Sequence, residues 1–366
     1  MKLRVNLLFA AAFMTLFMVV SYDYLNSVFE SVRLMAGQNI HFRPSLLFQD
    51  AQAAVRKKPE DRITVINVGN LSRGEIGDQI RNIIQFKPKV IAIDIIFACE
   101  KRDSINCPQA FDPINNFKFY TAIISAQEAG IKVVMAERLL QSRNLFNKPT
   151  EVPEFDSIEH SDQELLQNAT EGYINLFAYE TDSAGLLYCR EVAPYFNVNG
   201  SREYSFAVKI AQAYDSGKTR KFLQRGNQSE VINFRGNTVS YKNPSPYAGH
   251  FTILDANQAL DTTTFTPDII ENKIVLFGFH GNDLTDVIAQ EDKYLTPLNQ
   301  QTHSGLVPDM FGVVIHANII SMILNEDFIE PANLLSTLFI SFLVALVSAT
   351  IFIAYLRISF LSRSGI

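Results

Sequence analysis

Cysteine is scarce in this chain of 366 residues, which contains three. Three cysteines match neither the paired spacing of a zinc site nor the cysteine density of a disulfide-rich scaffold. Catalytic signatures are missing as well, because the sequence has no H-E-x-x-H, G-x-S-x-G, C-x-x-C or Walker-type glycine loop. The six histidines lack ligand-like spacing, and no two carboxylates are paired in the sequence for acid–base chemistry. We therefore expect no enzymatic activity, no metal ion and no cofactor.

A basic surface is also lacking. The formal net charge is −6 and the basic residues are scattered along the chain, whereas nucleic-acid-binding domains carry clustered Lys and Arg. We therefore expect no nucleic-acid partner. Internal repeats, low-complexity tracts and long flexible linkers are absent from the sequence too, which predicts one main domain.

Two long hydrophobic stretches are present, Leu7–Val20 and Leu334–Leu356. The second is uncharged and long enough to cross a hydrocarbon core of about 30 Å. Basic residues flank both stretches on the side of the chain ends and acidic residues flank them on the inner side, which predicts two membrane passes with both termini cytoplasmic. The lipid bilayer is then a partner. The predicted parts are an N-terminal signal anchor (1–22), an exported domain (23–332), a transmembrane helix (333–357) and a short tail (358–366).

A cleaved signal peptide is the alternative for the first stretch. Cleavage requires a small-x-small site, and the sequence that follows, "SYDYLN", offers none. We therefore expect an uncleaved anchor.

Cys99 and Cys107 lie in one polar loop. Outside the cytoplasm they are candidates for a disulfide, which would contribute roughly 2–3 kcal/mol in the loop-entropy estimate. Two free surface thiols are the alternative. Cys189 lies in the apolar run "GLLYCREV" and is expected to be a buried free thiol.

The first half of the exported region alternates strands and helices. Apolar, β-branched runs predict strands at Arg62–Gly69, Lys87–Phe97 and 131–137, and helical spacing predicts helices over 72–86 and 119–130. Short βαβ links require parallel strands. The predicted fold class is α/β, with a mixed, largely parallel sheet flanked by helices.

The second half changes character. Residues 171–196 predict antiparallel strands around a "TDSAG" turn, an antiparallel hairpin region beside the main sheet. Further elements are predicted at five places: a helix over 204–217, a short strand in 229–237, a strand leading to a helix over 251–260, a strand at Asn272–Phe279, and a strand or helix over 309–324.

Several polar residues lie where α/β domains bind ligands, near the carboxyl ends of strands. Asp94 interrupts an apolar strand, so it should have a partner such as an arginine or backbone amides, or else line a pocket. The other candidate ligand residues are Asp283 and Asp286 after the strand that ends at Phe279, Thr296 in the following turn, and Arg190 and Arg235, which close strands and are suited to pair with these acids.

His316 and Asn318 lie in the apolar segment "GVVIHANIISMIL" just before the second hydrophobic stretch. In a strand they would share one face, whereas in a helix His316 would neighbour Gly312 and Ile320. Either a hydrogen-bonded core histidine locks this last element to the sheet, or the joint passes strain from the domain into the membrane helix.

The motifs "VIAIDIIF", "TDSAGLLYCREV", "INFRGN", "NKIVLFGF", "LTDVI…YLTPLN" and "DMFGVVIHANIISMIL" occur in this order. Together they resemble the second type of CHASE domain, a cyclase- and histidine-kinase-associated sensory extracellular domain, and look most like the Bacteroidetes versions. The resemblance covers nearly the whole exported region. It implies a periplasmic sensory domain anchored in the bacterial inner membrane. Asn67 stands where many relatives have an acid, and one C-terminal span is visible where the family typically has several before an output module.

Two functions follow as hypotheses. In the first, the domain senses an unknown periplasmic ligand and passes a conformational signal to a separate membrane or cytoplasmic protein that carries the output. In the alternative, the chain is a structural accessory subunit of an envelope complex and the domain is a docking platform. A homodimer is a further assembly left open.

Overall fold

In a computed structural model, the described residues are 59–97, 112–142, 154–167, 169–180, 187–241, 250–284, 291–298, 307–329, 339 and 342–351. The chain divides into two compact units, residues 41–329 and residues 1–40 with 330–366. The first unit is the domain described below.

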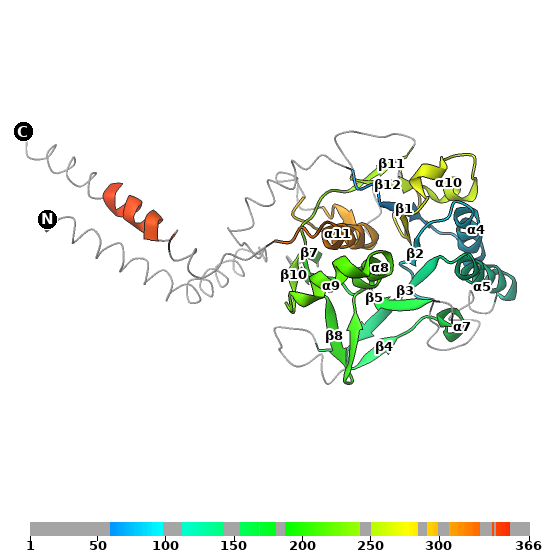
Figure 1. The fold of residues 1–366 in the computed structure, drawn as a ribbon, viewed down its shortest axis with the longest axis horizontal. Coiled ribbons are helices and arrows are strands. Elements are labelled where there is room, and N and C mark those ends of the chain that lie inside the picture. The colour runs from blue at the N-terminus through cyan, green and yellow to red at the C-terminus, as the bar shows by residue number, and fades with distance from the viewer. Residues whose placement is uncertain are drawn as a thin grey trace, which may run out of the picture. The chain divides into compact units, whose positions relative to one another are not determined.

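A sheet of eight strands forms the centre of the domain as far as it is described (Figure 1). Its strands run in the order β11 (Thr238–Ser240), β12 (Phe251–Leu254), β1 (Ile63–Asn67), β13 (Ile274–Gly278), β2 (Val90–Ile93), β3 (Lys132–Leu140) and β4 (Ser157–Glu159), with β5 (Thr170–Tyr173) also paired to β3. Every pair is parallel except β3–β4. The prediction of a largely parallel sheet is confirmed.

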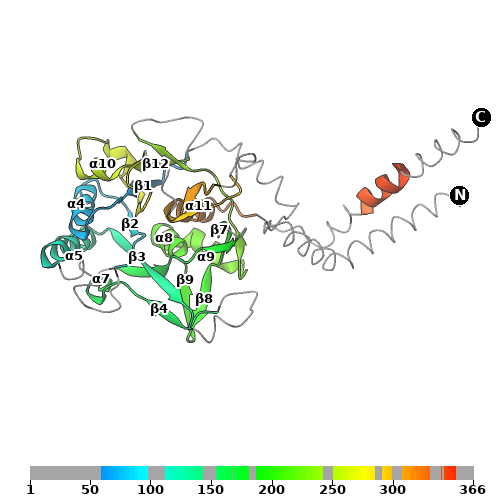
Figure 2. The same cartoon turned by 180° about the vertical axis from the view of Figure 1, so that it is seen from behind.

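Helices cover both faces of the sheet, as the two views in Figures 1 and 2 show. One face carries α4 (Arg73–Ile84), α5 (Pro113–Glu128), α7 (Gln163–Leu166), α10 (Ala256–Leu260) and the short 3₁₀ helix η2 (Pro267–Ile269), and the other carries α8 (Phe206–Tyr214), α9 (Ser216–Gln224) and α11 (Gly312–Asn325). Adjacent strand residues alternate between the cores on the two faces of the sheet. Val65 packs in the core beneath α8, α9 and α11, whereas Ile66 packs in the core beneath α4, α5 and α10. Strands buried on both faces explain the continuous apolar runs of the sequence.

Local sequence explains how the helices begin and how closely they pack. Ser72 and Glu75 form a capping box at the start of α4. A Cβ atom at Gly77 would lie 2.9 Å from backbone atoms of Phe119 in α5, so the absence of a side chain permits the close crossing of these two helices.

Smaller antiparallel elements lie outside the main sheet. They are β6 (Phe177–Glu180) and β7 (Leu187–Val192) with β10 (Glu230–Val231), the hairpin β8 (Tyr195–Val198) and β9 (Ser201–Tyr204), and the pair β14 (Lys293–Tyr294) and β15 (Met310–Phe311). The predicted antiparallel region is confirmed by β6 and β7, which flank the "TDSAG" segment. The hairpin β8–β9 was not predicted, and the strand predicted in 229–237 is reduced to two residues.

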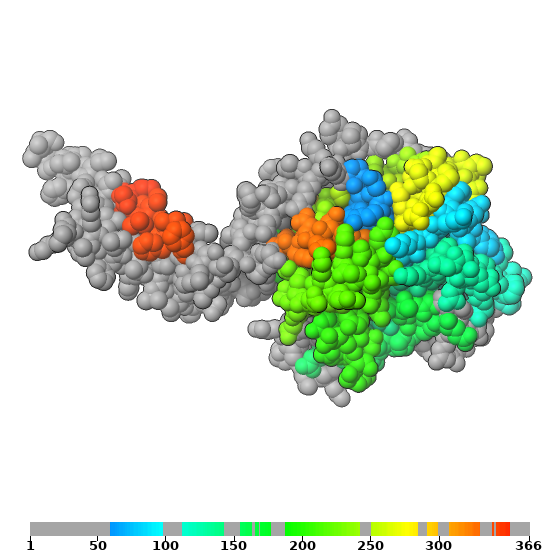
Figure 3. Space-filling view, viewed as in Figure 1, coloured from blue at the N-terminus to red at the C-terminus, as the bar shows by residue number. Residues whose placement is uncertain are grey.

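The last segment of the domain is a helix, which resolves the choice between strand and helix. β15 leads directly into α11, whose residues from Gly312 to Leu324 are all buried. The C-terminal end of α11 is tied to the start of the described domain. The carboxylate of Glu60 accepts hydrogen bonds from Ser321 Oγ at 2.6 Å and Asn325 Nδ2 at 2.9 Å. In Figure 3 the start of the described domain (blue) and the α11 region (orange) lie close together on the visible surface.

The predicted membrane stretches fall mostly outside the described residues: Leu7–Val20 entirely, and Leu334–Leu356 except for residues 339 and 342–351. Residues 342–351 are helical, with Ala345 and Ala349 buried and larger apolar side chains exposed. Among the described residues, no helix combines the length and the hydropathy needed to cross a membrane.

The structure describes one of the three cysteines. Cys99 and Cys107 lie outside the described residues. Cys189 is a buried free thiol in β7, which confirms the prediction, and burial raises the pKa of this thiol well above its usual range.

Candidate functional site

A cavity of about 580 Å³ opens at the carboxyl ends of the parallel strands, beyond β2 and β13. This is the edge at which open α/β sheets bind their ligands. Its walls come from six parts of the domain: the residues after β2, the end of β3, the loop after β5, the residue after β13, the β14 region and the first turns of α11. The lining residues are Asp94, Ile95, Ile96, Arg138, Ile174, Asn175, Leu176, Phe279, Glu291, Asp292, Tyr294, Gly312 and His316.

Asp94 follows the last residue of β2 and extends the ladder, since its backbone N–H donates to the Phe277 carbonyl at 2.8 Å. Its carboxyl group makes no hydrogen bond or ion pair with any other described residue. The expected arginine or amide partner is not found among the described residues, and the alternative, that Asp94 lines a pocket, agrees with its position in the cavity wall. Burial, together with the negative charge of Asp292, raises the pKa of Asp94 well above its usual range.

Asp292 lies at the rim of the cavity, where it adopts a left-handed backbone conformation with φ of 54°. The Gly312 backbone N–H donates to the Asp292 carbonyl oxygen at 3.0 Å, and the Asp292 carboxylate also lies close to Gly312 at the start of α11. A Cβ atom at Gly312 would lie 2.8 Å from Asp292 Oδ2, so only glycine allows this approach. Desolvation raises the pKa of Asp292 to about 6, although the Gly312 backbone lowers it. Because Asp292 is exposed, solvent screens its charge, and the effect on stability is smaller than for Asp94.

His316 lies one turn beyond Gly312 on the same face of α11, as predicted for a helix. The side chain is 3% exposed, packs edge-to-face against Phe206 at 5.4 Å and hydrogen-bonds to the backbone of Ile174. Nδ1 has no hydrogen-bond partner in the described structure. Burial lowers the pKa of His316 to about 4, so the ring is neutral at pH 7.

Asn318 lies away from the cavity and fastens α11 to the segment before β11. Its Oδ1 accepts from the backbone N–H of Arg235 at 2.7 Å, and its Nδ2 donates to the carbonyls of Gly236 and Val314. Arg235 forms an ion pair with Asp327, beyond the end of α11, at 2.9 Å. The locking contact predicted for this segment is therefore made by Asn318, together with the Glu60 contacts described above.

The other predicted site residues are not among those that line the cavity. Thr296 donates through Oγ1 to Asp309 at 2.6 Å and holds the turn between β14 and β15. Arg190 is buried in β7 and donates to Tyr188 Oη at 2.9 Å. Asp283 is exposed, and Asp286 lies outside the described residues. Of the eight ligand-binding candidates, the structure brings Asp94 and His316 together.

Asn67 lies at the carboxyl end of β1, next to the cavity along the same edge of the sheet, and its side chain is fully hydrogen-bonded. Its Oδ1 accepts from the backbone N–H groups of Gly69 and His280, and its Nδ2 donates to the carbonyl of Gly281 and to Asp255. These bonds join the carboxyl ends of β1, β12 and β13. Asn67 is fully buried and has no donor or acceptor left for a ligand.

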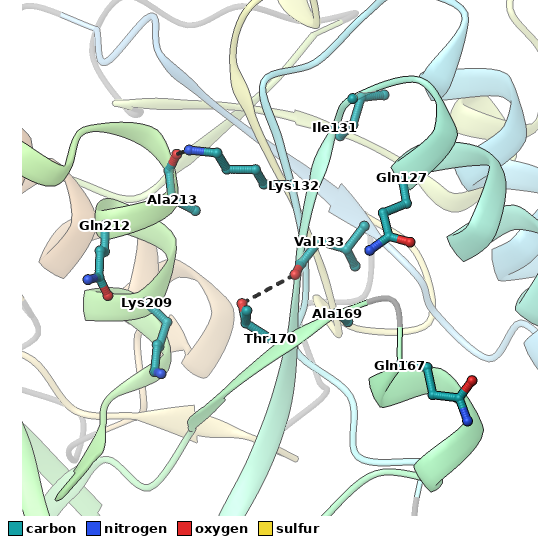
Figure 4. Close-up of a pocket in the computed structure, with 11 residues that line it drawn as sticks. Gln127, Ile131, Lys132, Val133, Gln167, Ala169, Thr170, Lys209, Gln212 and Ala213 are labelled. Carbon is teal, nitrogen blue, oxygen red and sulfur yellow. Dashed lines mark hydrogen bonds between the residues drawn. The ribbon is translucent and has the colours of Figure 1, made fainter.

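A second cavity, of about 590 Å³, lies at the amino ends of β3 and β5 (Figure 4). Two of its polar side chains bond within the protein: Lys132 Nζ donates to the Ala213 carbonyl at 2.7 Å, and Thr170 Oγ1 donates to the Val133 carbonyl. None of the predicted ligand residues lines this cavity. The cavity beside Asp94 is therefore the candidate functional site.

Comparison with known protein families agrees with the motifs. A family model described as the CHASE2 domain matches residues 50–354. No curated protein and no solved structure matches the chain. The matched region contains the whole described domain, including Asp94, Asp292 and α11. The chain therefore belongs to the CHASE2 domain family of sensory extracellular domains.

Proposed function

We propose that this chain is the sensory subunit of a bacterial inner-membrane assembly. Its domain binds a small ligand in the periplasm, in the cavity beside Asp94, and passes a conformational change across the membrane to a separate protein that carries the output. The role is binding, not catalysis. The observation that carries the proposal is that α11 lines the cavity at one end and leads toward the second hydrophobic stretch at the other.

The charge pattern and the apolar stretches support two membrane passes with both termini cytoplasmic. The described part of the second stretch adds to this. Its large apolar side chains are exposed, namely Phe339, Leu343, Val344, Val347 and Ile351, whereas Ala345 and Ala349, one turn apart, are buried. A membrane helix that turns large side chains to lipid and packs a small-residue face against protein has this distribution.

The lining of the cavity favours a ligand with an amino group or another cationic group. Asp94, Asp292 and Glu291 contribute three carboxyl groups. Among the described lining residues Arg138 is the one arginine, and it already forms an ion pair with Glu159 at 3.4 Å. His316 is neutral at pH 7 because its pKa is about 4. A bound cation would relieve the repulsion between Asp94 and Asp292 and would stabilise both in their ionised forms.

A ligand in this cavity contacts the helix that must respond to it. Gly312 and His316 form part of the wall, and Asn325, at the other end of α11, is bound to Glu60. A ligand shifts the position of α11 only to the extent that it binds two positions with different affinity. Ionised Asp292 beside the N-terminus of α11 provides such a difference, since a carboxylate interacts favourably with that end of the helix.

The first prediction concerns Asp94→Asn in the full-length protein, purified in mild detergent. Wild type and variant are titrated with putrescine, spermidine, ethanolamine and arginine, and binding is followed by calorimetry and thermal unfolding. At least one amine is expected to bind wild type, and the variant is expected to lose at least about tenfold in affinity, equivalent to one ion pair of roughly 1.4 kcal/mol. Amide exchange along α11 is expected to change in the wild-type complex.

The variant should remain folded and be more stable than wild type at pH 7. The folded-state pKa of Asp94 is raised, so its ionisation costs stability as pH rises from about 4, and the amide avoids this cost. At pH 4 the two proteins should be equally stable. Glu128→Gln, an exposed change at the end of α5, is the matched control and should leave binding intact. Equal amine binding by wild type and Asp94→Asn would contradict the cationic ligand, and unchanged exchange in α11 would contradict the coupling.

One observation favours the docking-platform alternative. α5 exposes Ile114 (71%) and Phe117 (68%) on adjacent turns of one face, where a solvated helix normally carries polar residues. If the domain docks a partner protein through this face, Ile114→Ser/Phe117→Ser should abolish the co-purification of a stoichiometric partner in mild detergent while leaving the melting temperature within about 2 °C. Retention of the partner by this variant would exclude the α5 face as the docking site.

A further inference from the structure

A second group of ligand-type side chains lies outside the cavity, around the second half of β3, which pairs with both β5 and β4. Glu137 of β3, Glu171 of β5 and His160, the residue after β4, each present one ligand atom, and these atoms all lie within 4.8 Å of one another. From this arrangement we propose that the domain contains a binding site for a divalent transition-metal ion, formed by these three residues. It is separate from the candidate sensory cavity.

The pairing of β3 with two different strands explains why these residues meet. The first part of β3 pairs in parallel with β5, up to Glu137 opposite Tyr173, and the next residue, Arg138, begins the antiparallel pairing with β4 opposite Glu159. His160 Nδ1 lies 2.8 Å from Glu171 Oε2 and 3.4 Å from Glu137 Oε2. Ligand atoms about 2.0–2.2 Å from one ion are separated by somewhat more than 3 Å, so His160 Nδ1 must move slightly away from Glu171 Oε2 when an ion binds. This side chain is half-exposed and has room to move.

The environment of the Glu137 side chain supports the metal site independently of the ligand distances. The residue is 2% exposed, yet no backbone or side-chain donor outside the cluster bonds to its carboxyl group among the described residues. A buried carboxyl group normally has a hydrogen-bond donor or a cation beside it. The negative charges of Glu171 and Glu203 act on this buried carboxyl group as well. A metal ion between Glu137, Glu171 and His160 supplies the missing positive charge.

The donor set favours zinc over magnesium or calcium. Mg²⁺ and Ca²⁺ take oxygen ligands almost exclusively, whereas Zn²⁺ binds one imidazole nitrogen and two carboxylates readily and leaves a fourth position for water. The backbone N–H of Ser161 donates to the other oxygen of Glu171 at 3.1 Å and fixes the orientation of that carboxylate. Such an outer hydrogen bond is typical of metal-binding carboxylates.

Zinc at this site would join β4 and β5 across β3, which pairs with both strands. The bound ion would hold β4 and β5 at fixed positions beside Glu137. Arg138, the next residue, lines the sensory cavity and pairs with Glu159. The metal would therefore stabilise one wall of the cavity without contacting the ligand.

The test uses the full-length protein in mild detergent, stripped with EDTA and dialysed. Zn²⁺ is the probe, with metal content measured by mass spectrometry and thermal unfolding recorded during titration. We expect about one Zn²⁺ per chain and an upward shift in Tm of roughly 5 °C at saturation. His160→Ala and Glu171→Gln are expected to lose at least about tenfold in zinc affinity and most of the shift.

Glu159→Gln is the matched control, because it removes a carboxylate next to His160 that belongs to the pair with Arg138 and not to the cluster. It should bind zinc as wild type does. Glu137→Gln tests the buried ligand: the amide keeps the shape, so the variant should fold and fail to bind zinc. Zinc binding that is unchanged in His160→Ala and Glu171→Gln would show adventitious binding elsewhere and overturn the proposal, as would the absence of a zinc-dependent Tm shift in wild type.

Discussion

Replacing Glu60 by alanine is expected to lower the free energy of unfolding of the domain by about 3 kcal/mol. Glu60 is 6% exposed and accepts four hydrogen bonds from three side chains: two from Arg62, at 2.6 and 2.7 Å, one from Ser321 and one from Asn325. The alanine variant leaves a buried hydroxyl, a buried amide and most of a guanidinium without their acceptor. Urea unfolding of the full-length protein at pH 7 measures this loss.

The same carboxylate gives the loss a pH dependence. Burial alone would raise the pKa of Glu60, but the hydrogen bonds from Arg62, Ser321 and Asn325 and the charge of Arg62 outweigh it and lower the pKa from 4.5 to about 2. A depressed folded-state pKa contributes stability that is complete above about pH 4.5 and is lost as the pH falls toward 2. The difference between wild type and Glu60→Ala should therefore shrink over this range. The exposed neighbour supplies the control: Asp61→Ala should change stability by less than about 0.5 kcal/mol. A constant difference from pH 7 to pH 3 would argue against this account.

Gly278→Val is expected to destabilise the domain by about 3 kcal/mol and to disturb the sensory cavity. Gly278 ends β13 where α11 crosses the sheet. A Cβ atom at this position would lie 2.5 Å from Cγ2 and 2.7 Å from Cβ of Val313, and 3.3 Å from Cβ of Asp94. Either α11 moves away from β13 or the strand end shifts, and both movements displace cavity walls. Thermal unfolding measures the loss of stability, and amine affinity measures the disturbance of the cavity.

A double-mutant cycle separates the clash from other effects of the substitution. Gly278→Ala is expected to destabilise wild type and to cost clearly less in a Val313→Ala background, because alanine lacks the closest atom, Cγ2 at 2.5 Å, although Cβ at 2.7 Å remains. Additive effects of the two substitutions would show that close packing against Val313 is not the reason for glycine at this position.

The sequence predicted the parts of the fold that local physics determines. Continuous apolar runs identified β1, β2, β3 and β13 because parallel strands in a three-layer domain are buried on both faces. Helical spacing identified α4 and α8. The hairpin β8–β9 was missed because all its residues except Val198 are exposed or half-buried and its strands lack an alternating apolar pattern. β4 was missed because three residues with one apolar side chain carry no periodic signal.

The candidate site was predictable only where an anomaly stood inside an apolar run. Asp94 and His316 are polar residues within such runs, and both line the cavity. Asp292 and Arg138 gave no signal, because a charged residue in a loop or near the end of a strand is ordinary. The proposed metal ligands are 23 and 11 residues apart, on three different strands, so no spacing rule joins them. Only the pairing of β3 with both β5 and β4, whose following residue is His160, brings them together.

The bonds between Glu60 and α11 also determine how the domain would carry mechanical load. Glu60 lies next to the first described residue of the domain, and Asn325 lies four residues before its last, Ile329. A pulling force applied between these two ends would act on the short path through Glu60, Ser321 and Asn325. The hydrogen-bond ladders of the sheet lie outside that path. The sheet would therefore be shielded from tension along the chain, and the end of α11 would be the first element to yield.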